Sequence, residues 1–412
     1  MAKANDILRN PHILTTRPAA RTPVTRRDAQ IKALAPQKPL YVFDPVRLAQ
    51  SYRRFATSFG GEIAYAVKCN PHPAVLQLLA EEGIAAFDVA SLAEIRAARA
   101  AAPQAKLFFM HPVKAPEDIA AAYHDYGVRA FVLDHVDELY KILRATELAQ
   151  DLELFVRLAL PKNGKAALDF SSKFGAQPEE AAVLLEACRP VCRKLGLAFH
   201  VGTQNTDIGA YARAVGVAAD VIRSANVTVD VLDLGGGFPA CYLERTPSLN
   251  AIFREIRAAV LTHGLHHMEL MAEPGRALVA DCMSLIVRVE QRRGDLLYIN
   301  DGVYGGLFDA GPSLRWRYPV RRISRDKDAE TGVTTAFRFA GPTCDSIDMM
   351  DGPFMLPDEI KAGDWIEIKQ AGAYSQCLRT DFNGFGDAGF LVLDMPGESP
   401  VKPVKQRKQT KQ

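Results

Sequence analysis

Long hydrophobic runs, a strong net charge and cysteine clusters of the metal-binding type are all missing from this sequence of 412 residues. No apolar run reaches the ~18 residues that a membrane-spanning helix needs. Fifty Lys and Arg against 48 Asp and Glu leave a net charge of +2, which is too small to indicate a nucleic-acid partner. The seven cysteines lack metal-type spacing and fit a reducing compartment better than a disulfide framework. We therefore expect a globular, cytoplasmic protein with no metal, membrane or nucleic-acid partner.

The two ends of the sequence are basic, unlike the rest of the chain. Residues 1–35 hold seven basic and two acidic side chains, and residues 399–412 hold five basic and no acidic ones. The first run lacks the apolar segment of a secretory signal, and the last run lacks any apolar periodicity. We predict a partly disordered segment over 1–37 and a disordered basic tail over 399–412.

Eight short apolar runs alternate with stretches of helical spacing in the first two thirds of the chain. The runs are residues 62–67, 84–87, 106–109, 130–133, 154–158, 196–200, 231–234 and 269–272. This alternation is typical of a closed (β/α)₈ barrel of the TIM type, with a doubly wound open sheet as the alternative. We expect the barrel domain to span residues 38–276.

The pattern of residue types changes after residue 276. β-Branched and aromatic runs separated by Gly, Pro and Asp continue to about residue 398, a pattern that predicts antiparallel strands. The sequence thus indicates an α/β protein with a C-terminal antiparallel β-domain over 277–398. The apolar run PLYVF at 39–43 offers an N-terminal strand, within residues 38–45, that would pair with this second domain.

Chemically capable residues follow the predicted barrel strands at one end. They are Lys68 after the first strand, Asp88 after the second, Arg157 in the fifth, His200 after the sixth, Gly235 to Gly237 after the seventh and Glu273 after the eighth. Taken singly, each has an ordinary structural explanation, because a lone lysine is usually solvated and a run of glycines usually forms a turn. Barrel enzymes carry their sites at the C-terminal ends of the strands, so the joint placement favours a functional site.

These residues match the needs of one cofactor, pyridoxal 5'-phosphate. Lys68 can form a Schiff base, provided that burial and neighbouring charge keep its amine neutral often enough. Glu273 can pair with the pyridine nitrogen and keep it protonated, so that the ring accepts electrons from the substrate's α-carbon. The glycines let backbone N–H groups approach a phosphate, and Arg276 supplies a bidentate charge partner.

Three further residues on this rim would support the cofactor. His200 could lie flat against the ring, where an imidazole supports the cofactor's electronics without a covalent role. Asp88 and Arg157 would hold Lys68 and the edge of the ring in position.

Nine motifs extend this match along the chain between about residues 38 and 390. They are YAVKCN (65–70), FDVAS (87–91), KFGA (173–176), FHVGTQ (199–204), LGGGFP (234–239), EPGR (273–276), DGVYG (301–305), GPTCDS (341–346) and GAYS with FNGF (372–375, 382–385). In these motifs and their order the sequence resembles the pyridoxal-phosphate-dependent basic amino-acid decarboxylases with an alanine-racemase-like barrel. This is the ornithine, diaminopimelate and arginine decarboxylase family, and the resemblance is strongest to its ornithine decarboxylase group.

The resemblance assigns roles to individual residues. Lys68 would carry the cofactor and His200 would stack on its ring, as expected above. The full cofactor-binding set would be Lys68, Asp88, Arg157, His200, Thr203, Gly236, Gly237, Glu273, Gly275, Arg276 and Tyr374. Thr203 stands where the family has a serine and keeps a hydroxyl group.

The resemblance also implies a head-to-tail homodimer with shared active sites. The GPTCDS loop of one subunit would complete the site of the other. Cys344 in this loop would be a catalytic residue that delivers a proton to the α-carbon after CO₂ leaves, and Asp345 would bind the substrate's distal ammonium group.

The substrate follows from the charges expected at its distal end. Asp309 and Asp345 favour a distal ammonium group, which ranks L-ornithine first, with putrescine for polyamine biosynthesis as the product. Lysine ranks second, and diaminopimelate or arginine follow. Arg315 and Arg317 could instead receive a distal carboxylate, although surface charges are their more ordinary explanation. A racemase, and a catalytically inactive relative that acts as a binding protein, are the alternatives of other classes.

Overall fold

The computed structural model describes residues 26–161, 173–326 and 332–393. The predicted tail over 399–412 and residues 1–25 of the predicted N-terminal segment lie outside these ranges. Arg26–Leu34 form a helix, α1, that the sequence pattern did not reveal. The chain divides into two units, each described by itself: Met1–Leu40, Leu285–Ile368 and Asp381–Gly389 form one, and Tyr41–Ser284, Lys369–Thr380 and Phe390–Gln412 form the other.

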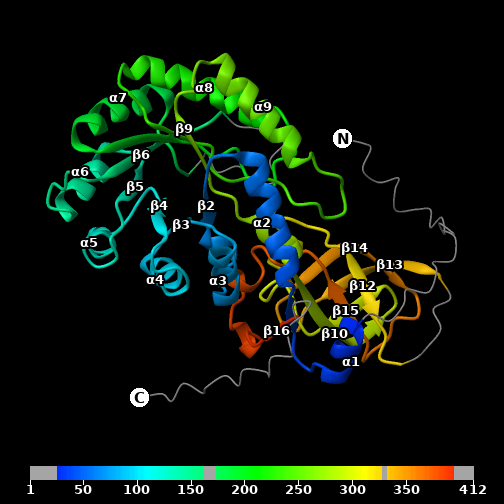
Figure 1. The fold of residues 1–412 in the computed structure, drawn as a ribbon. Coiled ribbons are helices and arrows are strands. Elements are labelled where there is room, and N and C mark those ends of the chain that lie inside the picture. The colour runs from blue at the N-terminus through cyan, green and yellow to red at the C-terminus, as the bar shows by residue number, and fades with distance from the viewer. Residues whose placement is uncertain (1–25, 162–172, 327–331, 394–412) are drawn as a thin grey trace, which may run out of the picture. The chain divides into compact units, whose positions relative to one another are not determined.

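The second unit contains a closed barrel of eight parallel strands, which confirms the barrel and excludes the open sheet. The strands follow one another around the ring in sequence order (Figure 1). They are β2 (Glu62–Ala66), β3 (Ala86–Val89), β4 (Lys106–Phe109), β5 (Ala130–Leu133), β6 (Glu153–Arg157), β7 (Lys194–Ala198), β8 (Val231–Asp233) and β9 (Glu269–Ala272).

Helices alternate with the strands and lie outside the ring (Figure 1). They are α2 (Pro45–Phe59), α3 (Pro73–Glu81), α4 (Leu92–Ala101), α5 (Pro116–His124), α6 (Val136–Ala145), α7 (Pro178–Cys188), α8 (Ala210–Ala225), α9 (Leu249–Thr262) and the short α10 (Arg276–Val279). Proline starts α2, α3, α5 and α7, because its missing N–H costs nothing in the first turn of a helix. Among the described residues no helix is long and apolar enough to cross a membrane.

Two barrel strands lie two residues away from the predicted runs. β3 starts later than predicted and includes Asp88, and β7 starts earlier, at Lys194, and ends before Phe199. In both cases a polar side chain belongs to the strand itself. Apolar runs locate a strand poorly where an ionisable residue continues it.

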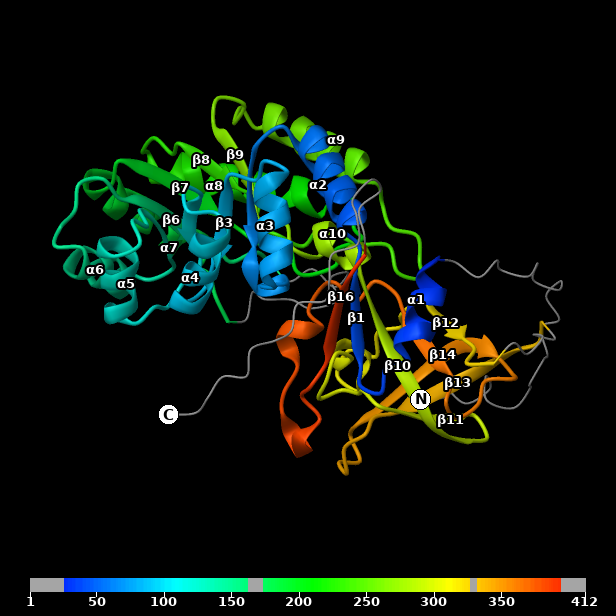
Figure 2. The same ribbon diagram turned by 60° about the horizontal axis from the view of Figure 1, so that its bottom comes forward.

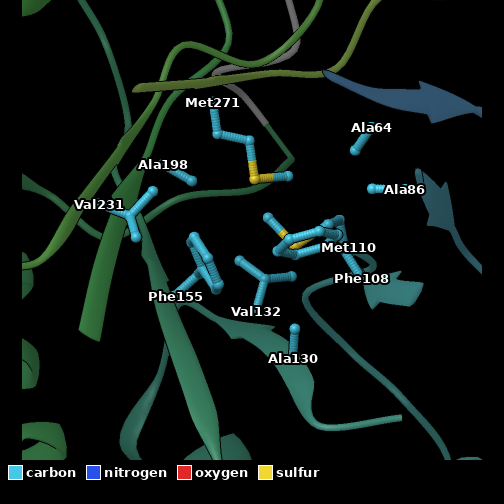
Figure 3. Packing of buried hydrophobic residues seen from close by; sticks show 10 residues of the cluster. All are labelled: Ala64, Ala86, Phe108, Met110, Ala130, Val132, Phe155, Ala198, Val231 and Met271. Carbon is cyan, nitrogen blue, oxygen red and sulfur yellow. The ribbon is translucent and has the colours of Figure 1, made fainter. Parts of the chain in front are cut away.

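Apolar side chains fill the middle of the barrel (Figure 3). Alternate residues of a strand face the same side, and every barrel strand contributes to one buried cluster. Its members are Ala64, Ala86, Phe108, Met110, Ala130, Val132, Phe155, Ala198, Val231 and Met271. A side chain at Gly196 would collide with the ring of Phe155, so the large and small residues are matched. The interior is thus packed, and polar chemistry is confined to the ends of the barrel.

The remaining strands form a mixed sheet with the order β12-β15-β10-β11-β13-β14. They are β10 (Met283–Arg293), β11 (Leu296–Ile299), β12 (Val320–Ile323), β13 (Thr334–Ala340), β14 (Met349–Pro357) and β15 (Trp365–Ile368). Their pairing is antiparallel except between β11 and β13. β1 (Leu40–Phe43) pairs with β10 and with β16 (Gly389–Val392), as Figure 2 lets the reader follow. The predicted β-domain that takes the N-terminal strand is therefore confirmed.

Candidate active site

Lys68 follows β2 in a single 3₁₀ turn (η2, Val67–Cys69) at the C-terminal end of the barrel. Its Nζ lies 2.8 Å from Oδ2 of Asp88, and the two side chains are 47% and 2% exposed. Burial alone would lower the pKa of this amine, but Asp88, Tyr374 and Glu273 outweigh it and the pKa is raised. The expectation that the surroundings favour a neutral amine is therefore wrong for the cofactor-free chain, because Asp88 stabilises the ammonium form.

Glu273 stands just after β9 and is 4% exposed. Its backbone N–H donates to the carbonyl of Gly235, which ties it to the loop after β8. Burial, followed by the negative charges of Asp233 and Asp88, raises the pKa of Glu273 well above its ordinary value. One of its carboxyl oxygens, Oε1, is buried without a hydrogen-bond partner. A buried, unsatisfied acceptor of this kind can receive an N–H group from a ligand.

His200 lies at the end of the sixth barrel strand, two residues beyond β7. Its Nδ1 accepts a hydrogen bond of 2.9 Å from the backbone N–H of Gly202. Burial, followed by the charges of Arg157 and Lys68, lowers the pKa of His200 well below its ordinary value. The ring is thus neutral and carries its proton on Nε2, which leaves it suited to lie against a flat conjugated ligand.

A glycine cradle lies between the loops that follow β7 and β8. A Cβ atom at Gly236 would stand 2.8 Å from the carbonyl oxygen of Glu273 and 3.1 Å from Nε2 of His200. Gly237 has φ +95°, and a Cβ there would collide with the carbonyl of Gly202. The hydroxyl of Tyr211 donates to the Gly236 carbonyl at 2.8 Å. Only glycine fits this loop, whose backbone can then approach an anion closely.

Arg276 and Tyr374 meet beside this cradle. The guanidinium carbon of Arg276 lies 4.9 Å from the centre of the Tyr374 ring, and Nη1 donates to the Tyr242 hydroxyl at 2.7 Å. The Tyr374 backbone N–H bonds the Cys69 carbonyl at 3.0 Å, next to the lysine. A Cβ at Gly275 would stand 2.8 Å from Cβ of Cys69. Close packing thus holds the arginine and the lysine on one rim.

The two remaining predicted cofactor ligands lie on the same rim. Arg157 ends β6 and is half-buried, and its charge lowers the pKa of His200, as described above. Thr203 is half-buried in the loop after β7, and this loop is tied to the cradle where the Asn205 N–H donates to the Gly237 carbonyl at 2.9 Å. The structure therefore brings the predicted cofactor-binding set together at one end of the barrel.

Pyridoxal 5'-phosphate fits this rim on three counts. The glycine cradle beside Arg276 suits a phosphate group. The buried carboxyl group of Glu273 suits a protonated ring nitrogen, and the amine of Lys68 is accessible to an aldehyde. Fold and site together define a barrel protein that binds pyridoxal phosphate.

The predicted residues of the GPTCDS loop gather in the other unit. Asp345 accepts a hydrogen bond of 2.6 Å from the Tyr304 hydroxyl, which lowers the pKa of Asp345. The Cys344 thiol is exposed and donates to Oδ1 of Asn383 at 3.3 Å. The buried carboxylate of Asp348 anchors the loop by accepting the backbone N–H of Thr343 and its hydroxyl. Thiol and carboxylate are thus presented side by side on a fixed loop.

Asp309 and the two arginines occupy the preceding segment of the same unit. Asp309 lies in the 3₁₀ helix η5 (Phe308–Ala310) and is 3% exposed. Arg315 and Arg317 are exposed. Because a substrate ligand must be reachable, Asp345 is the better candidate, and the role of Asp309 stays a prediction.

Sequence reasoning missed several residues that the structure adds to the site. Asp233 is fully buried beside Glu273, Tyr242 contacts Arg276, and Tyr304 and Asn383 hold the GPTCDS loop. Tyr304 and Asn383 belong to motifs already noted, DGVYG and FNGF, so their motifs were the signal. Tyr242 carries no pattern of its own, and Asp233 looked like part of an apolar run.

Comparison with known proteins identifies the family. A family described as "Pyridoxal-dependent decarboxylase, pyridoxal binding domain" matches residues 46–280, and the chain belongs to this family of carboxy-lyases. A lysine/ornithine decarboxylase from Selenomonas ruminantium is 31% identical to this chain. The similarity covers 89% of this chain and 93% of that relative. The antizyme inhibitor 2 of Xenopus laevis is 32% identical over 78% of this chain and 73% of its own.

A solved structure agrees with this assignment. The lysine/ornithine decarboxylase of Vibrio vulnificus complexed with putrescine has a TM-score of 0.75 and 29% sequence identity. The similarity covers 89% of this chain and 98% of that one.

Proposed function

We propose that this protein decarboxylates a basic L-amino acid, with L-ornithine as the preferred substrate and putrescine and CO₂ as products. The observation that carries the proposal is the half-buried Asp345 carboxylate, whose pKa is lowered by the Tyr304 hydroxyl. A carboxylate held ionised in this way is the partner that a distal ammonium group needs. The relatives named lysine/ornithine decarboxylase support lysine as the second candidate.

The barrel rim would hold and orient the cofactor. Arg276 and the N–H groups of the glycine cradle would bind its phosphate, Glu273 would pair with its ring nitrogen, and neutral His200 would support the ring. When bound, the cofactor's ring accepts the electrons left at the α-carbon as CO₂ departs. Asp88 holds the amine of Lys68 at the rim, where it would be available to the cofactor's aldehyde group.

The loop with Cys344 would act on the substrate. Its thiol donates a proton to the α-carbon after CO₂ leaves, and Asn383 fixes the direction of the sulfur. Asp345 sets which end of the substrate faces away from the ring. We further propose that the enzyme is a homodimer in which this loop serves the partner's rim; a cytoplasmic location stays a prediction.

A screen of four amino acids tests the substrate. Ornithine, lysine, arginine and diaminopimelate are each incubated with the cofactor-loaded protein, and amine products are identified by mass spectrometry. We expect the highest kcat/KM for ornithine. Faster turnover of diaminopimelate would contradict the proposal. It would indicate that Arg315 and Arg317 bind a distal carboxylate of the substrate.

A matched pair of variants tests the role of Asp345. Asp345→Asn should raise the KM for ornithine about 10- to 100-fold, because a charge-assisted contact is lost. Asp351→Asn alters an exposed aspartate of the same unit and should leave KM unchanged.

Two outcomes of the screen would favour other classes of protein. A cofactor-loaded protein that releases no amine from any of the four would act as a binding protein, as the name of the Xenopus relative suggests for that relative. Conversion of one enantiomer into the other without amine would indicate a racemase.

A further inference from the structure

Asp233 and Glu273 form an acid pair within the barrel rim. Asp233 ends β8 and is 0% exposed, and its Oδ1 accepts the backbone N–H of Gly235 at 2.9 Å. Its other oxygen, Oδ2, is buried without a partner, like Oε1 of Glu273. Gly235 joins the two acids, because its N–H donates to Asp233 and its carbonyl accepts the backbone N–H of Glu273 at 2.9 Å, and the negative charge of Asp233 raises the pKa of Glu273. Two acceptor oxygens can face each other in a dry site only if a proton lies between them.

The charges around the pair also call for one proton. Three acids point into this rim, namely Asp88 on β3, Asp233 on β8 and Glu273 after β9, and they face the charges of Lys68 and Arg157. His200 is neutral, as shown above. If Asp233 and Glu273 were both ionised, two negative charges would lie next to each other in a buried setting, which is costly. One proton shared by the pair removes this repulsion. In agreement, burial raises the pKa of Asp233 above its ordinary value.

We infer that Asp233 is a positioning residue that shares one proton with Glu273 and thereby fixes the carboxylate that serves the cofactor's ring nitrogen. The proton bridges Oδ2 of Asp233 and Oε1 of Glu273. The second oxygen of Glu273 then remains for the ring nitrogen, and the pair keeps one negative charge to hold that nitrogen protonated. The inference rests on the proposed role of Glu273 and adds a residue to it.

Two variants of similar size separate the bridge from mere packing. Asp233→Asn keeps a hydrogen-bond donor toward Oε1, so Glu273 should stay oriented and ionised. Asp233→Leu offers no donor, so the carboxylate of Glu273 loses the hydrogen bond that orients it. The cofactor's ring nitrogen should then lose its proton at a pH at least about one unit lower, because its anionic partner is no longer held in place.

The nitrogen is observed directly with pyridoxal phosphate labelled with ¹⁵N in the ring. We expect the ¹⁵N chemical shift of the ring nitrogen to titrate at the same pH in the wild type and in Asp233→Asn. In Asp233→Leu it should titrate at a lower pH. In steady-state kinetics kcat should fall about 10-fold or more in Asp233→Leu with little change in KM. In the Glu273→Gln background, Asp233→Leu should have almost no further effect, because residues that act through one another are not additive.

The cofactor-free full chain gives a second readout. A folded state that binds one proton more than the unfolded state loses stability as the pH rises from about 4 through the pKa of the pair. Its unfolding constant increases about tenfold per pH unit over that interval. Asp233→Asn has no shared proton and should remove this part of the pH dependence. Glu62→Gln, at the other end of the barrel, serves as the control that must leave the ring nitrogen unchanged.

Several outcomes would overturn the inference. Asp233→Leu with a wild-type nitrogen titration would show that Asp233 does not act through Glu273. An equal fall in kcat in Asp233→Asn and Asp233→Leu would show that the negative charge of Asp233 matters and that the proton bridge does not. If Asp233→Leu fails to fold, an unaltered pH dependence of unfolding in Asp233→Asn would refute the shared proton. A covalent link between Lys68 and the cofactor in all variants would leave the proposed function standing in each case.

Discussion

The two ends of the barrel interior are both charged, but their charges are organised in opposite ways. At the N-terminal end Lys106 lies 2.7 Å from Glu153 and 3.9 Å from Glu62, and Lys194 lies 2.6 Å from Glu269. There, cations and carboxylates alternate and each has an opposite partner. At the C-terminal end two buried acids, Asp233 and Glu273, crowd together, and the negative charge of Asp233 raises the pKa of Glu273.

The difference separates charge that stabilises the fold from charge that serves chemistry. Paired groups at the N-terminal end offset their own desolvation. The crowded end stores unfavourable energy, which a bound cation or N–H donor would relieve. Substitutions at the first end should therefore change stability, and those at the second should change cofactor binding and turnover.

The largest expected effect is that of Lys68→Ala. Turnover should drop at least about a thousandfold, since the nucleophile for the aldehyde is lost. Denatured, borohydride-reduced protein should show no added cofactor mass. Circular dichroism should be unchanged. A cofactor mass on another lysine, with turnover retained, would show that the rim is misassigned.

Lys106→Met makes the matching change at the other end. We expect the free energy of unfolding to fall by about 1–3 kcal/mol, which is less than for a fully buried pair because Lys106 is one-third exposed and Arg193 remains 2.6 Å from Glu153. Denaturant titration measures this loss. The kcat per cofactor-loaded molecule should stay at the wild-type value.

The comparison would fail if Lys106→Met lowered kcat at full cofactor loading. That result would mean that the packed middle layer transmits changes from one end to the other. Phe108 and Phe155 would then be the residues to examine.

The sequence was sufficient to predict the strand order and to predict that Lys68, His200 and Glu273 lie at the same end of the barrel. Periodicity of apolar runs located eight strands, because a barrel core needs an inward-facing side chain on every strand. The same logic hid Asp233, which stands inside the run VLDL at a position where an apolar residue is expected. The ion pairs at the N-terminal end of the barrel could not be predicted for the same reason, since Lys106 and Glu153 are the first residues of strands that are otherwise apolar.

Contacts between distant loops could not be predicted from one sequence. Tyr242 meets Arg276 across 34 positions, and Tyr304 meets Asp345 across 41. Neither pair has a spacing that local geometry dictates. The raised pKa of Lys68 was missed for a related reason, because the sign depends on whether burial or Asp88 prevails, and this requires a distance.

Tyr242→Phe is the smallest and most specific change. It removes the hydroxyl that accepts the 2.7 Å hydrogen bond from Nη1 of Arg276 and keeps the ring beneath the guanidinium group. We expect the Kd for pyridoxal phosphate to rise about 3- to 10-fold, because one charge-assisted hydrogen bond that orients Arg276 is lost. Fluorescence titration of the cofactor-free protein measures this. Tyr126→Phe removes a similar contact with exposed Arg96 and should leave Kd unchanged. Equal affinity in both variants would mean that the C-terminal rim orients its arginine without Tyr242, and only the crowded acids would then distinguish the two ends.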